Sequence, residues 1–446
     1  MRHALPPIHF IGIGGIGMSA LAKLMKSRGH AVTGSDLVLS DITKDLEQFG
    51  IQVFEDHLAQ NVPTDADLVV YSGAVPESNP ERVQAKKLGI KQVTYGQMLG
   101  EVSKEYLTIA VSGTNGKSTT TAMLGKILEA AGFDPTVLVG TYVPGFAHGN
   151  LRLGQSRFFV VEGCEYQANM LNMEPAMIVL TNIEEDHLDY YRDLDHIRQT
   201  FQKFVDKLTG EGKCVVNARD PQSQKLTIQN PVTYGFQTKA DYKGWKRITA
   251  VGKQAFELAK HGKIILQIPG EFNVENALAA AAAALELGVK FKDCQKALKE
   301  FPGAWRRFER VGEFMGATII SDYGHHPTAI EGTLKAAKEF FPKRRIILCF
   351  QPHQHSRTKE LFDDFVKVLS KAENLIIPEI YGVSGRTEPE AAEISSLDLV
   401  KKIPRSEYAP DLPTAEQMLR DKIQKDDVVI IMGAGDVDQI ARNLVK

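Results

Sequence analysis

The chain of 446 residues carries 53 Lys and Arg against 55 Asp and Glu, a formal net charge of -2, and 43% of its residues are hydrophobic. This length and hydrophobic content predict a globular protein of roughly three domains. The near balance of charge excludes a general electrostatic attraction to nucleic acid or to an anionic membrane, so we expect neither as a partner and no membrane insertion.

The cysteines indicate where the protein works. The chain contains four of them, widely spaced and without a C-x-x-C pair, and it shows no signal peptide and no long apolar span. This combination predicts free thiols, a reducing environment and a cytoplasmic location.

The first hundred residues alternate short apolar strands with amphipathic helices. We expect strands at residues 8–11, 31–34 and 68–71 and helices at residues 18–27 and 80–88. This alternation is typical of a doubly wound α/β domain, similar to a Rossmann fold.

A glycine-rich turn separates the first strand from the first helix. Its glycines are Gly12, Gly14, Gly15 and Gly17, and Asp36 ends the second strand 19 residues after Gly17. Glycines let a backbone approach a pyrophosphate, and a carboxylate at that strand end suits a ribose or uridine hydroxyl. NAD and the diphosphate of a UDP-linked molecule are both consistent with this pattern, and a purely structural turn is the third interpretation.

Residues 112–120, Ser-Gly-Thr-Asn-Gly-Lys-Ser-Thr-Thr, join an apolar strand at residues 107–111 to an amphipathic helix. Such a loop points backbone N–H groups and a helix N-terminus at an anion. We expect Lys117 to reach the β- and γ-phosphates of ATP, and the hydroxyl of Ser118 or Thr119 to ligate Mg²⁺. Val111 replaces the first glycine of the strict phosphate-loop pattern. The expected phosphate-binding residues are therefore Gly113, Thr114, Asn115, Gly116, Lys117, Ser118 and Thr119.

The central region continues with expected strands at residues 158–161, 177–180 and 214–216 and an alanine-rich helix at residues 276–287. Glu162 and His187 follow two of these strands, so both should reach the sheet edge at the phosphate loop, where they could hold Mg²⁺. A helix cap or a surface histidine is the alternative. Asn273 and Asn276, at the start of the alanine-rich helix, either cap it or face a nucleotide.

The last region restarts the α/β pattern, with expected strands at residues 317–321, 345–350, 375–377 and 428–432. Arg307 lies at the junction, where its guanidinium could reach a phosphate when domains close. Two polar segments, 322–327 and 351–358, each follow a strand. Their histidines lack zinc-site spacing, so we favour a small zwitterion, with Arg357 binding its carboxylate.

These segments, taken in order, resemble the Mur ligase family, the ATP-dependent amino-acid ligases of peptidoglycan precursor synthesis. The resemblance covers essentially the whole chain. It rests on HFIGIGGIGMSALA, SGTNGKSTTT, TNIEEDHLDYY, the Asn273 and Asn276 pair, WRRFE, DYGHHPT, FQPHQHSRT and GAGD.

The resemblance implies three α/β domains, namely a Rossmann-like UDP-sugar domain at residues 1–104, a central ATP-binding domain with a mixed sheet at 105–311, and a Rossmann-like amino-acid domain at 312–446. The implied reaction joins an amino acid, expected to be L-alanine, to the lactyl carboxylate of UDP-N-acetylmuramate through an acyl phosphate. ATP and Mg²⁺ are the implied cofactors, and the implied state is a monomer or homodimer. A murein tripeptide recycling ligase and, in another class, an NAD-dependent dehydrogenase are the alternatives.

The resemblance also assigns roles to single residues. It implies that Lys117, Glu162, His187, Arg307 and Asp322 are catalytic, with Ser118, Glu162 and His187 around Mg²⁺. Asn273, Asn276 and Arg307 join the phosphate loop in binding ATP. The implied substrate-binding residues are Gly12, Gly14, Gly15, Gly17, Asp36, His325, His353 and Arg357. The chain departs from the family pattern at Gln354, where a basic residue is often found, and in the segment from Glu162 to Gln167, Glu-Gly-Cys-Glu-Tyr-Gln.

Overall fold

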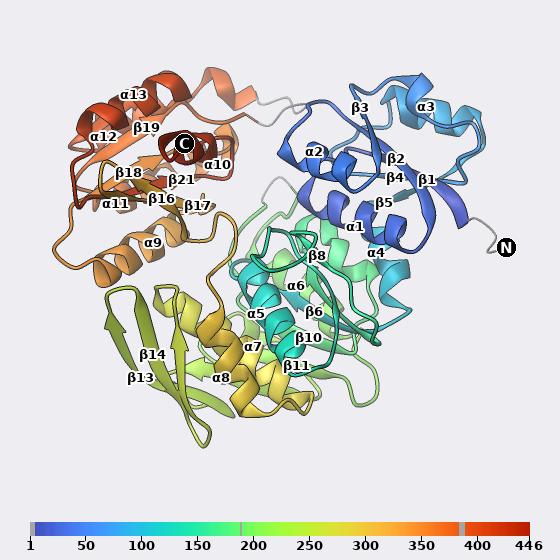
Figure 1. Ribbon diagram of the computed structural model, residues 1–446, viewed down its shortest axis with the longest axis horizontal. Coiled ribbons are helices and arrows are strands. Elements are labelled where there is room, and N and C mark those ends of the chain that lie inside the picture. The colour runs from blue at the N-terminus through green and yellow to red at the C-terminus, as the bar shows by residue number, and fades with distance from the viewer. Residues whose placement is uncertain (1–4, 188–189, 383–388) are drawn as a thin grey trace. The chain divides into compact units, whose positions relative to one another are not determined.

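A computed structural model describes residues 5–187, 190–382 and 389–446, and its strands form three sheets (Figure 1). Two residues of the TNIEEDHLDYY segment, 188 and 189, lie outside the described residues. The chain divides into two compact units. The first comprises Met1–Trp245, Leu258–Gly262 and Glu275–Leu298, and the second comprises Lys246–Glu257, Lys263–Val274 and Lys299–Lys446.

The first sheet is parallel and has the strand order β3-β2-β1-β4-β5. Its strands are β1 (Leu5–Ile11), β2 (His30–Asp36), β3 (Gln52–Glu55), β4 (Leu68–Tyr71) and β5 (Lys91–Thr94). The helices around it are α1 (Ile16–Ser27), α2 (Asp41–Gln48), α3 (Pro80–Lys87) and α4 (Tyr95–Ser103), with a short η1 (Ala59–Asn61). The strand order reverses on either side of β1, so the glycine-rich turn leaves the sheet where such folds bind ligands.

The second sheet has ten strands in the order β15-β14-β13-β12-β11-β10-β6-β9-β7-β8. Its centre is β6 (Leu107–Ser112) between β9 (Phe158–Gly163) and β10 (Met177–Leu180), all parallel. The other strands are β7 (Thr136–Leu138), β8 (Leu151–Arg152), β11 (Lys213–Asn217), β12 (Pro231–Phe236), β13 (Tyr242–Ala250), β14 (Lys253–Leu258) and β15 (Gly262–Leu266). The pair β7 and β8 is antiparallel, so the sheet is mixed, as expected.

The helices of this region follow the same chain order. They are α5 (Lys117–Ala130), α6 (Leu194–Val205), α7 (Glu271–Glu286) and α8 (Phe291–Glu300), with η2 (Tyr166–Asn172) and η3 (Ser223–Lys225). Helix α7 begins five residues earlier than the predicted start at residue 276, so both Asn273 and Asn276 lie inside it. An asparagine inside the helix cannot be its N-cap, and the capping interpretation of these residues is wrong.

The third sheet has the order β16-β17-β21-β18-β19-β20, with only β16 antiparallel to its neighbour. Its strands are β16 (Glu309–Phe314), β17 (Ala317–Asp322), β18 (Ile346–Phe350), β19 (Leu375–Pro378), β20 (Ser406–Ala409) and β21 (Val428–Met432). The helices are α9 (Pro327–Phe340), α10 (His355–Glu360), α11 (Phe362–Leu369), α12 (Ser396–Lys402), α13 (Leu412–Lys422) and α14 (Asp438–Leu444), with η4 (Pro389–Ala392).

Alternation along the strands explains how the third sheet is covered on both faces. On β18, Leu348 and Phe350 belong to one buried cluster, whereas Ile347 and Cys349 belong to the other. Side chains at successive strand positions point to opposite faces, so an uninterrupted apolar strand needs a layer of helices on each side. The predicted class, α/β with Rossmann-like first and last sheets, is confirmed.

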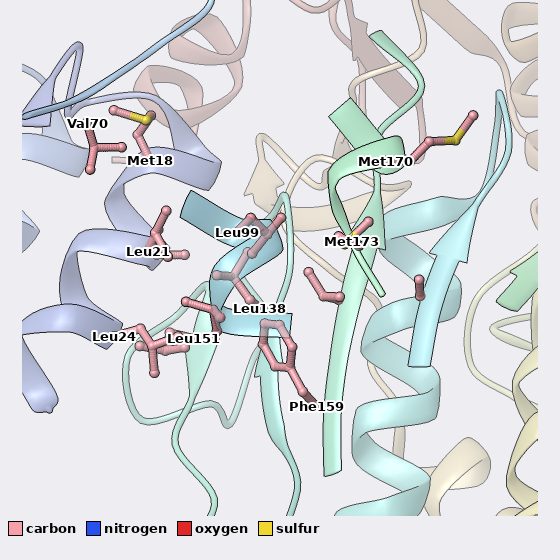
Figure 2. Packing of buried hydrophobic residues seen from close by; sticks show 14 of the residues in the cluster. Met18, Leu21, Leu24, Val70, Leu99, Leu138, Leu151, Phe159, Met170 and Met173 are labelled. Carbon is pink, nitrogen blue, oxygen red and sulfur yellow. The ribbon is translucent and has the colours of Figure 1, made fainter. Parts of the chain in front are cut away.

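One hydrophobic core joins the first two sheets inside the first unit. Met18, Leu21 and Leu24 of α1 belong to the same buried cluster as Leu138, Leu151 and Phe159 of the second sheet (Figure 2). Burying these side chains together stabilises the contact between the two sheets as well as each sheet alone. Within the described ranges, no helix has both the length and the apolar composition needed to cross a membrane.

Candidate active site

The loop between β6 and α5 has the geometry of an anion cradle. Gly113 and Gly116 both adopt positive φ, of 133° and 85°. A Cβ at Gly113 would lie 2.1 Å from Thr181 Oγ1, and one at Gly116 would lie 2.3 Å from Asn276 Oδ1. Gly116 is the N-cap of α5 and has no side chain that could cap the helix, which is a geometry typical of helix N-termini that bind anions.

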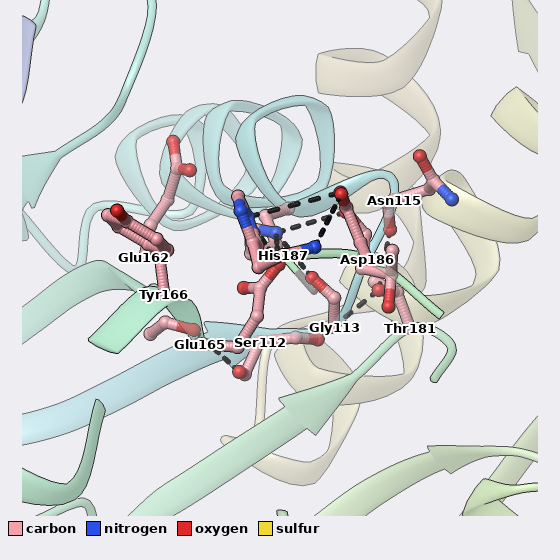
Figure 3. Close-up of polar contacts among 12 residues, drawn as sticks. Ser112, Gly113, Asn115, Glu162, Glu165, Tyr166, Thr181, Asp186 and His187 are labelled. Atoms are coloured by element: carbon pink, nitrogen blue, oxygen red, sulfur yellow. Dashed lines mark hydrogen bonds and ion pairs between the residues drawn. The ribbon is translucent and has the colours of Figure 1, made fainter. Parts of the chain in front are cut away.

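The segment after β10 fixes the shape of this loop. Asn182 accepts hydrogen bonds from the N–H of Thr114 through its carbonyl and from the N–H of Asn115 through Oδ1, both at 2.9 Å. Thr181 Oγ1 donates to the Asn115 carbonyl at 2.6 Å (Figure 3). The N–H groups of Thr114 and Asn115 are thus engaged within the protein, and the N-cap Gly116 contributes no side-chain cap to α5.

Lys117 is held at the mouth of the loop by a buried carboxylate. Its Nζ donates to Glu165 Oε1 at 2.8 Å and to the Thr114 carbonyl at 3.0 Å. Burial acts to lower the pKa of Lys117, but the negative charge of Glu165 outweighs it and the pKa is raised. The lysine therefore stays charged, and it is the first residue of α5.

The proposed metal-binding side chains fall into two groups. Ser118 Oγ donates to Glu162 Oε2 at 3.1 Å, and the Gly140 N–H donates to the other oxygen of Glu162. His187 adopts φ 55°, and its Nε2 lies 3.9 Å from Glu165 Oε1 and 3.9 Å from Asp186 Oδ2. The structure thus brings Ser118 to Glu162, and places His187 beside Glu165.

Glu165 is the site residue that the sequence reasoning missed. It is 2% exposed, and among the described residues its Oε2 has no hydrogen-bond partner. The available signal was its position three residues after Glu162, which places both carboxylates just past the apolar part of one strand.

The oxygen donors of this site fit Mg²⁺. In the described part of the chain, no three His, Cys, Asp or Glu side chains form a ready-made metal cluster. Mg²⁺ usually binds through one or two carboxylates together with substrate phosphates and water, so it needs no all-protein cage. Ser118, Glu162 and the second oxygen of Glu165 are hard donors of the required kind.

The two asparagines of α7 have different surroundings. Asn276 is 7% exposed, and its Oδ1 accepts a hydrogen bond from Thr120 Oγ1 of α5 at 3.3 Å. Asn273 is 3% exposed, and its Nδ2 donates to the Pro269 carbonyl at 2.7 Å. Asn276 therefore lies at the phosphate loop, as the nucleotide interpretation requires.

The glycine-rich turn of the first sheet is organised by Asp36. The Gly14 N–H donates to Asp36 Oδ2 at 2.8 Å, and a Cβ on Gly14 would lie 2.9 Å from the same oxygen. A Cβ on Gly17 would lie 2.8 Å from the Tyr95 hydroxyl. Asp36 thus shapes the turn through one oxygen, and a carboxylate retains further lone pairs for a substrate hydroxyl.

The two arginines before β16, Arg306 and Arg307, make different contacts. Arg306 is 7% exposed, and its Nη2 donates to the carbonyls of Gly433 and, at 2.8 Å, Gly435. The Arg307 guanidinium lies 4.6 Å from the centre of the Tyr323 ring. Arg306 therefore ties the segment before β16 to the loop after β21, whereas Arg307 lies over the Tyr323 ring.

Asp322, at the end of β17, is held by backbone donors. Its Oδ2 accepts from the Phe308 N–H at 2.8 Å and its Oδ1 from the Gly324 N–H at 2.7 Å. Burial raises the pKa of this carboxyl. The contacts support a role for Asp322 in shaping the two loops around it.

The expected amino-acid residues do meet on the rim of the third sheet. The rings of His325 and His353 lie 5.8 Å apart, and Arg357 Nη1 lies 3.4 Å from His353 Nδ1. Tyr381, which no motif singled out, stacks on His353 at 5.5 Å with an interplanar angle of 15°. Segments that follow three different strands therefore converge here.

The three α/β sheets and the phosphate loop between β6 and α5 are those of a nucleotide-binding protein. Family models match most of the chain, namely the Mur ligase family catalytic domain over residues 7–107, the Mur ligase middle domain over 111–284, and the Mur ligase glutamate ligase domain over 306–435. The chain belongs to the Mur ligase family, and the resemblance seen in its motifs is confirmed.

Individual relatives extend the match over the full length. The chain is 40% identical over 453 residues to the UDP-N-acetylmuramate--L-alanine ligase of Agathobacter rectalis, covering 98% of this chain and 97% of the relative. The UDP-N-acetylmuramate-alanine ligase structure from Thermotoga maritima is 31% identical, with a TM-score of 0.85 over 98% of both chains. A murein peptide ligase structure from Psychrobacter arcticus is 25% identical, with a TM-score of 0.75 over 98% of both chains.

Proposed function

We propose that this chain is an ATP-dependent ligase that joins L-alanine to the lactyl carboxylate of UDP-N-acetylmuramate. The observation that carries the proposal is the full-length similarity to UDP-N-acetylmuramate--L-alanine ligases, at 40% identity to the Agathobacter rectalis protein. The phosphate loop, with Lys117 and the N-terminus of α5 that carries no side-chain cap, supports the use of ATP.

The proposed reaction has two steps. An oxygen of the sugar's carboxylate attacks the γ-phosphorus of ATP, which forms an acyl phosphate and releases ADP. The amine of the amino acid then attacks the acyl carbon, and inorganic phosphate leaves as the amide forms. Lys117 and the N–H groups at the start of α5 offset the charge on the phosphates, and the rigid loop aligns the γ-phosphate. Mg²⁺ held by Ser118, Glu162 and His187, with Glu165 nearby, would neutralise further phosphate charge.

The sugar nucleotide and the amino acid are proposed to bind at other sheet edges. The turn with Gly12, Gly14, Gly15 and Gly17, together with Asp36, is proposed to bind the UDP part of the sugar nucleotide. His325, His353 and Arg357 are proposed to bind the amino acid, with Arg357 on its carboxylate. Asn273, Asn276 and Arg307 are proposed to bind ATP, and Asp322 is proposed to hold the two loops that it bonds to.

This assignment divides the chain into a UDP-sugar part at residues 1–104, an ATP part at 105–311 and an amino-acid part at 312–446. We propose that the protein works in the cytoplasm, as a monomer or homodimer, because ATP and nucleotide sugars are found there. The free state of all four cysteines supports a reducing compartment.

The likeness to a murein peptide ligase structure favours one second candidate, a ligase that accepts a tripeptide instead of a single amino acid. Purified protein should be incubated with ATP, Mg²⁺ and UDP-N-acetylmuramate, with L-alanine, glycine, L-serine or the tripeptide added singly. We expect phosphate release only in the complete mixture and fastest with L-alanine. Faster turnover with the tripeptide would favour the second candidate, and no turnover with any of the four would refute a ligase.

The metal assignment has a separate test. Glu162→Ala and His187→Ala should each lower kcat strongly and leave the affinity for UDP-N-acetylmuramate nearly unchanged, because neither side chain lies in the glycine-rich turn. Isothermal titration with the sugar nucleotide alone gives that affinity. A wild-type kcat in either variant would remove that residue from the metal site.

A further inference from the structure

Lys23 of α1 is a fully buried cation. It is 0% exposed, and its Nζ donates to a carboxylate oxygen of Asp45, to the His148 carbonyl at 3.2 Å and to Asn150 Oδ1 at 3.2 Å. Taking an ammonium group out of water is costly unless each of its N–H groups has an acceptor, so a buried lysine needs several acceptors held around its Nζ. One of these partners, Asp45, belongs to α2 beside the first sheet, and the other two, His148 and Asn150, belong to the loop before β8.

Asn150, which accepts a hydrogen bond from Lys23, also bonds to the start of α1. It is 0% exposed, and its Nδ2 donates to the Ile16 carbonyl at 2.7 Å and to Ser19 Oγ at 2.9 Å. Ile16 is the first residue of α1, immediately after the turn that contains Gly12 and Gly14. The Asn150 side chain, in the loop before β8, thus donates two hydrogen bonds to the first turn of α1, next to the proposed UDP site.

The same segment continues to the phosphate loop. The Asn150 carbonyl accepts from the Val139 N–H at 3.1 Å, and the next residue, Gly140, donates its N–H to Glu162. Glu162 in turn accepts from Ser118 Oγ at 3.1 Å. A short series of hydrogen bonds therefore runs from the start of α1 to the first turn of α5.

We propose that Lys23 and Asn150 are positioning residues for phosphoryl transfer, because they set the distance between the sugar-nucleotide turn and the γ-phosphate site at Ser118 and Glu162. The inference rests on the proposed function. The attacking carboxylate and the phosphate are held by different sheets, and a misplacement of about 1 Å costs roughly 10²-fold in rate.

The apolar contact between the sheets cannot supply this precision. Met18, Leu21 and Leu24 pack against the second sheet, but burial of apolar surface is non-directional and permits small shifts. Hydrogen bonds to a buried ammonium and a buried amide have narrow geometries, so they select one register of α1 on the second sheet.

A purely stabilising role makes a different prediction from a positioning role. Loss of stability alone reduces the amount of folded enzyme and leaves kcat of the folded fraction unchanged. Loss of positioning lowers kcat while each substrate still binds by itself, because the turn at Gly12 and the loop at Gly113 remain intact.

The variants are Lys23→Met, Asn150→Ala and the nearly isosteric Asn150→Asp, which keeps an acceptor for Lys23 but cannot donate to Ile16. Lys44→Met is the control, because Lys44 is 68% exposed and its ion pair among the described residues is with the exposed Asp41. We expect kcat to fall 10- to 100-fold in the three variants, with dissociation constants for a non-hydrolysable ATP analogue and for UDP-N-acetylmuramate within about threefold of wild type. The control should match wild type.

Enzyme concentrations are corrected by active-site titration, so that partial unfolding does not count as a lower kcat. A kcat within twofold of wild type in Asn150→Asp and Lys23→Met would overturn the inference, and so would weaker binding of one substrate with an unchanged kcat. Wild-type protein that ligates no acceptor would refute the proposed function itself. Unchanged variants of an active wild type would refute only the positioning role.

Discussion

The buried pair of Lys117 and Glu165 predicts a large and specific loss of stability in Glu165→Gln. The Nζ to Oε1 distance is 2.8 Å, and the two side chains are 15% and 3% exposed. At an effective dielectric of about 20, this separation corresponds to a gross attraction of about 6 kcal/mol, much of which offsets desolvation. Removing one partner of a buried pair costs about 3–5 kcal/mol. Because Lys117 keeps the carbonyls of Gly113 and Thr114, and glutamine keeps an acceptor, we expect about 2–3 kcal/mol.

Urea unfolding measures this loss, with the first transition of the wild type and of Glu165→Gln compared at constant m-value. Lys117→Met and the double variant complete a thermodynamic cycle, whose coupling energy isolates the pair. Glu129→Gln is the comparison, because Glu129 lies on α5, the helix of Lys117, is 35% exposed and pairs with Lys126 and Arg152. These half-buried pairs are less buried than the pair of Lys117 and Glu165, so the loss of stability in Glu129→Gln should be smaller, at about 1 kcal/mol.

Two results would contradict the reasoning. The first is a loss in Glu165→Gln no larger than that in Glu129→Gln. The second is a coupling energy between Lys117 and Glu165 near zero, which would mean that the two side chains lie apart in solution. Either result would also remove the basis for the raised pKa of Lys117, because Glu165 is the main group that raises it.

Two further predictions concern the first and second sheets. Burial acts to raise the pKa of Glu81, but the neighbouring His57 and His9 rings and the Ser35 hydroxyl outweigh it and lower the pKa from 4.5 to about 2. A folded pKa below the unfolded one means stability that is present above about pH 4.5 and lost as the pH falls toward 2, by up to about 3 kcal/mol. Unfolding curves of Glu81→Gln should lack that pH dependence, and an unchanged slope would contradict the assignment. Gly116→Ala should weaken binding of an ATP analogue at least tenfold, because the new Cβ would lie 2.3 Å from Asn276 Oδ1. The φ of 85° at residue 116 also disfavours alanine. Calorimetry measures the affinity, and a wild-type value would show that the loop tolerates a Cβ there.

Much of the fold was predictable, because its signals are local. The strands at 68–71, 177–180 and 428–432 match β4, β10 and β21 residue for residue, since each is a short apolar run with turn residues nearby. The start of α7 was predicted five residues late, because the regular alanine pattern that indicates a helix begins only after Asn276. Both amides belong to the first two turns of the helix and bond to groups outside it, to Pro269 and to Thr120.

The candidate site was predictable to the extent that its residues follow strands. The carboxyl ends of neighbouring parallel strands lie at one edge of a sheet. The positions of Gly113, Glu162 and Thr181 at the ends of β6, β9 and β10 therefore predict that the three residues lie near one another. The direction of each side chain was not predictable. Glu165, not Glu162, contacts Lys117, because the chain turns after β9 and η2 holds Glu165 beneath the loop.

By itself, the sequence determined the phosphate loop, the glycine-rich turn and the family, because each depends on contiguous residues whose conformation is set by glycine and by strand or helix boundaries. The tertiary structure alone decided which distant groups meet. Lys117 meets Glu165 across 48 positions, and Lys23 meets Asn150 across 127. Such pairs depend on strand order and on the packing of α1, and no local pattern of residues encodes them.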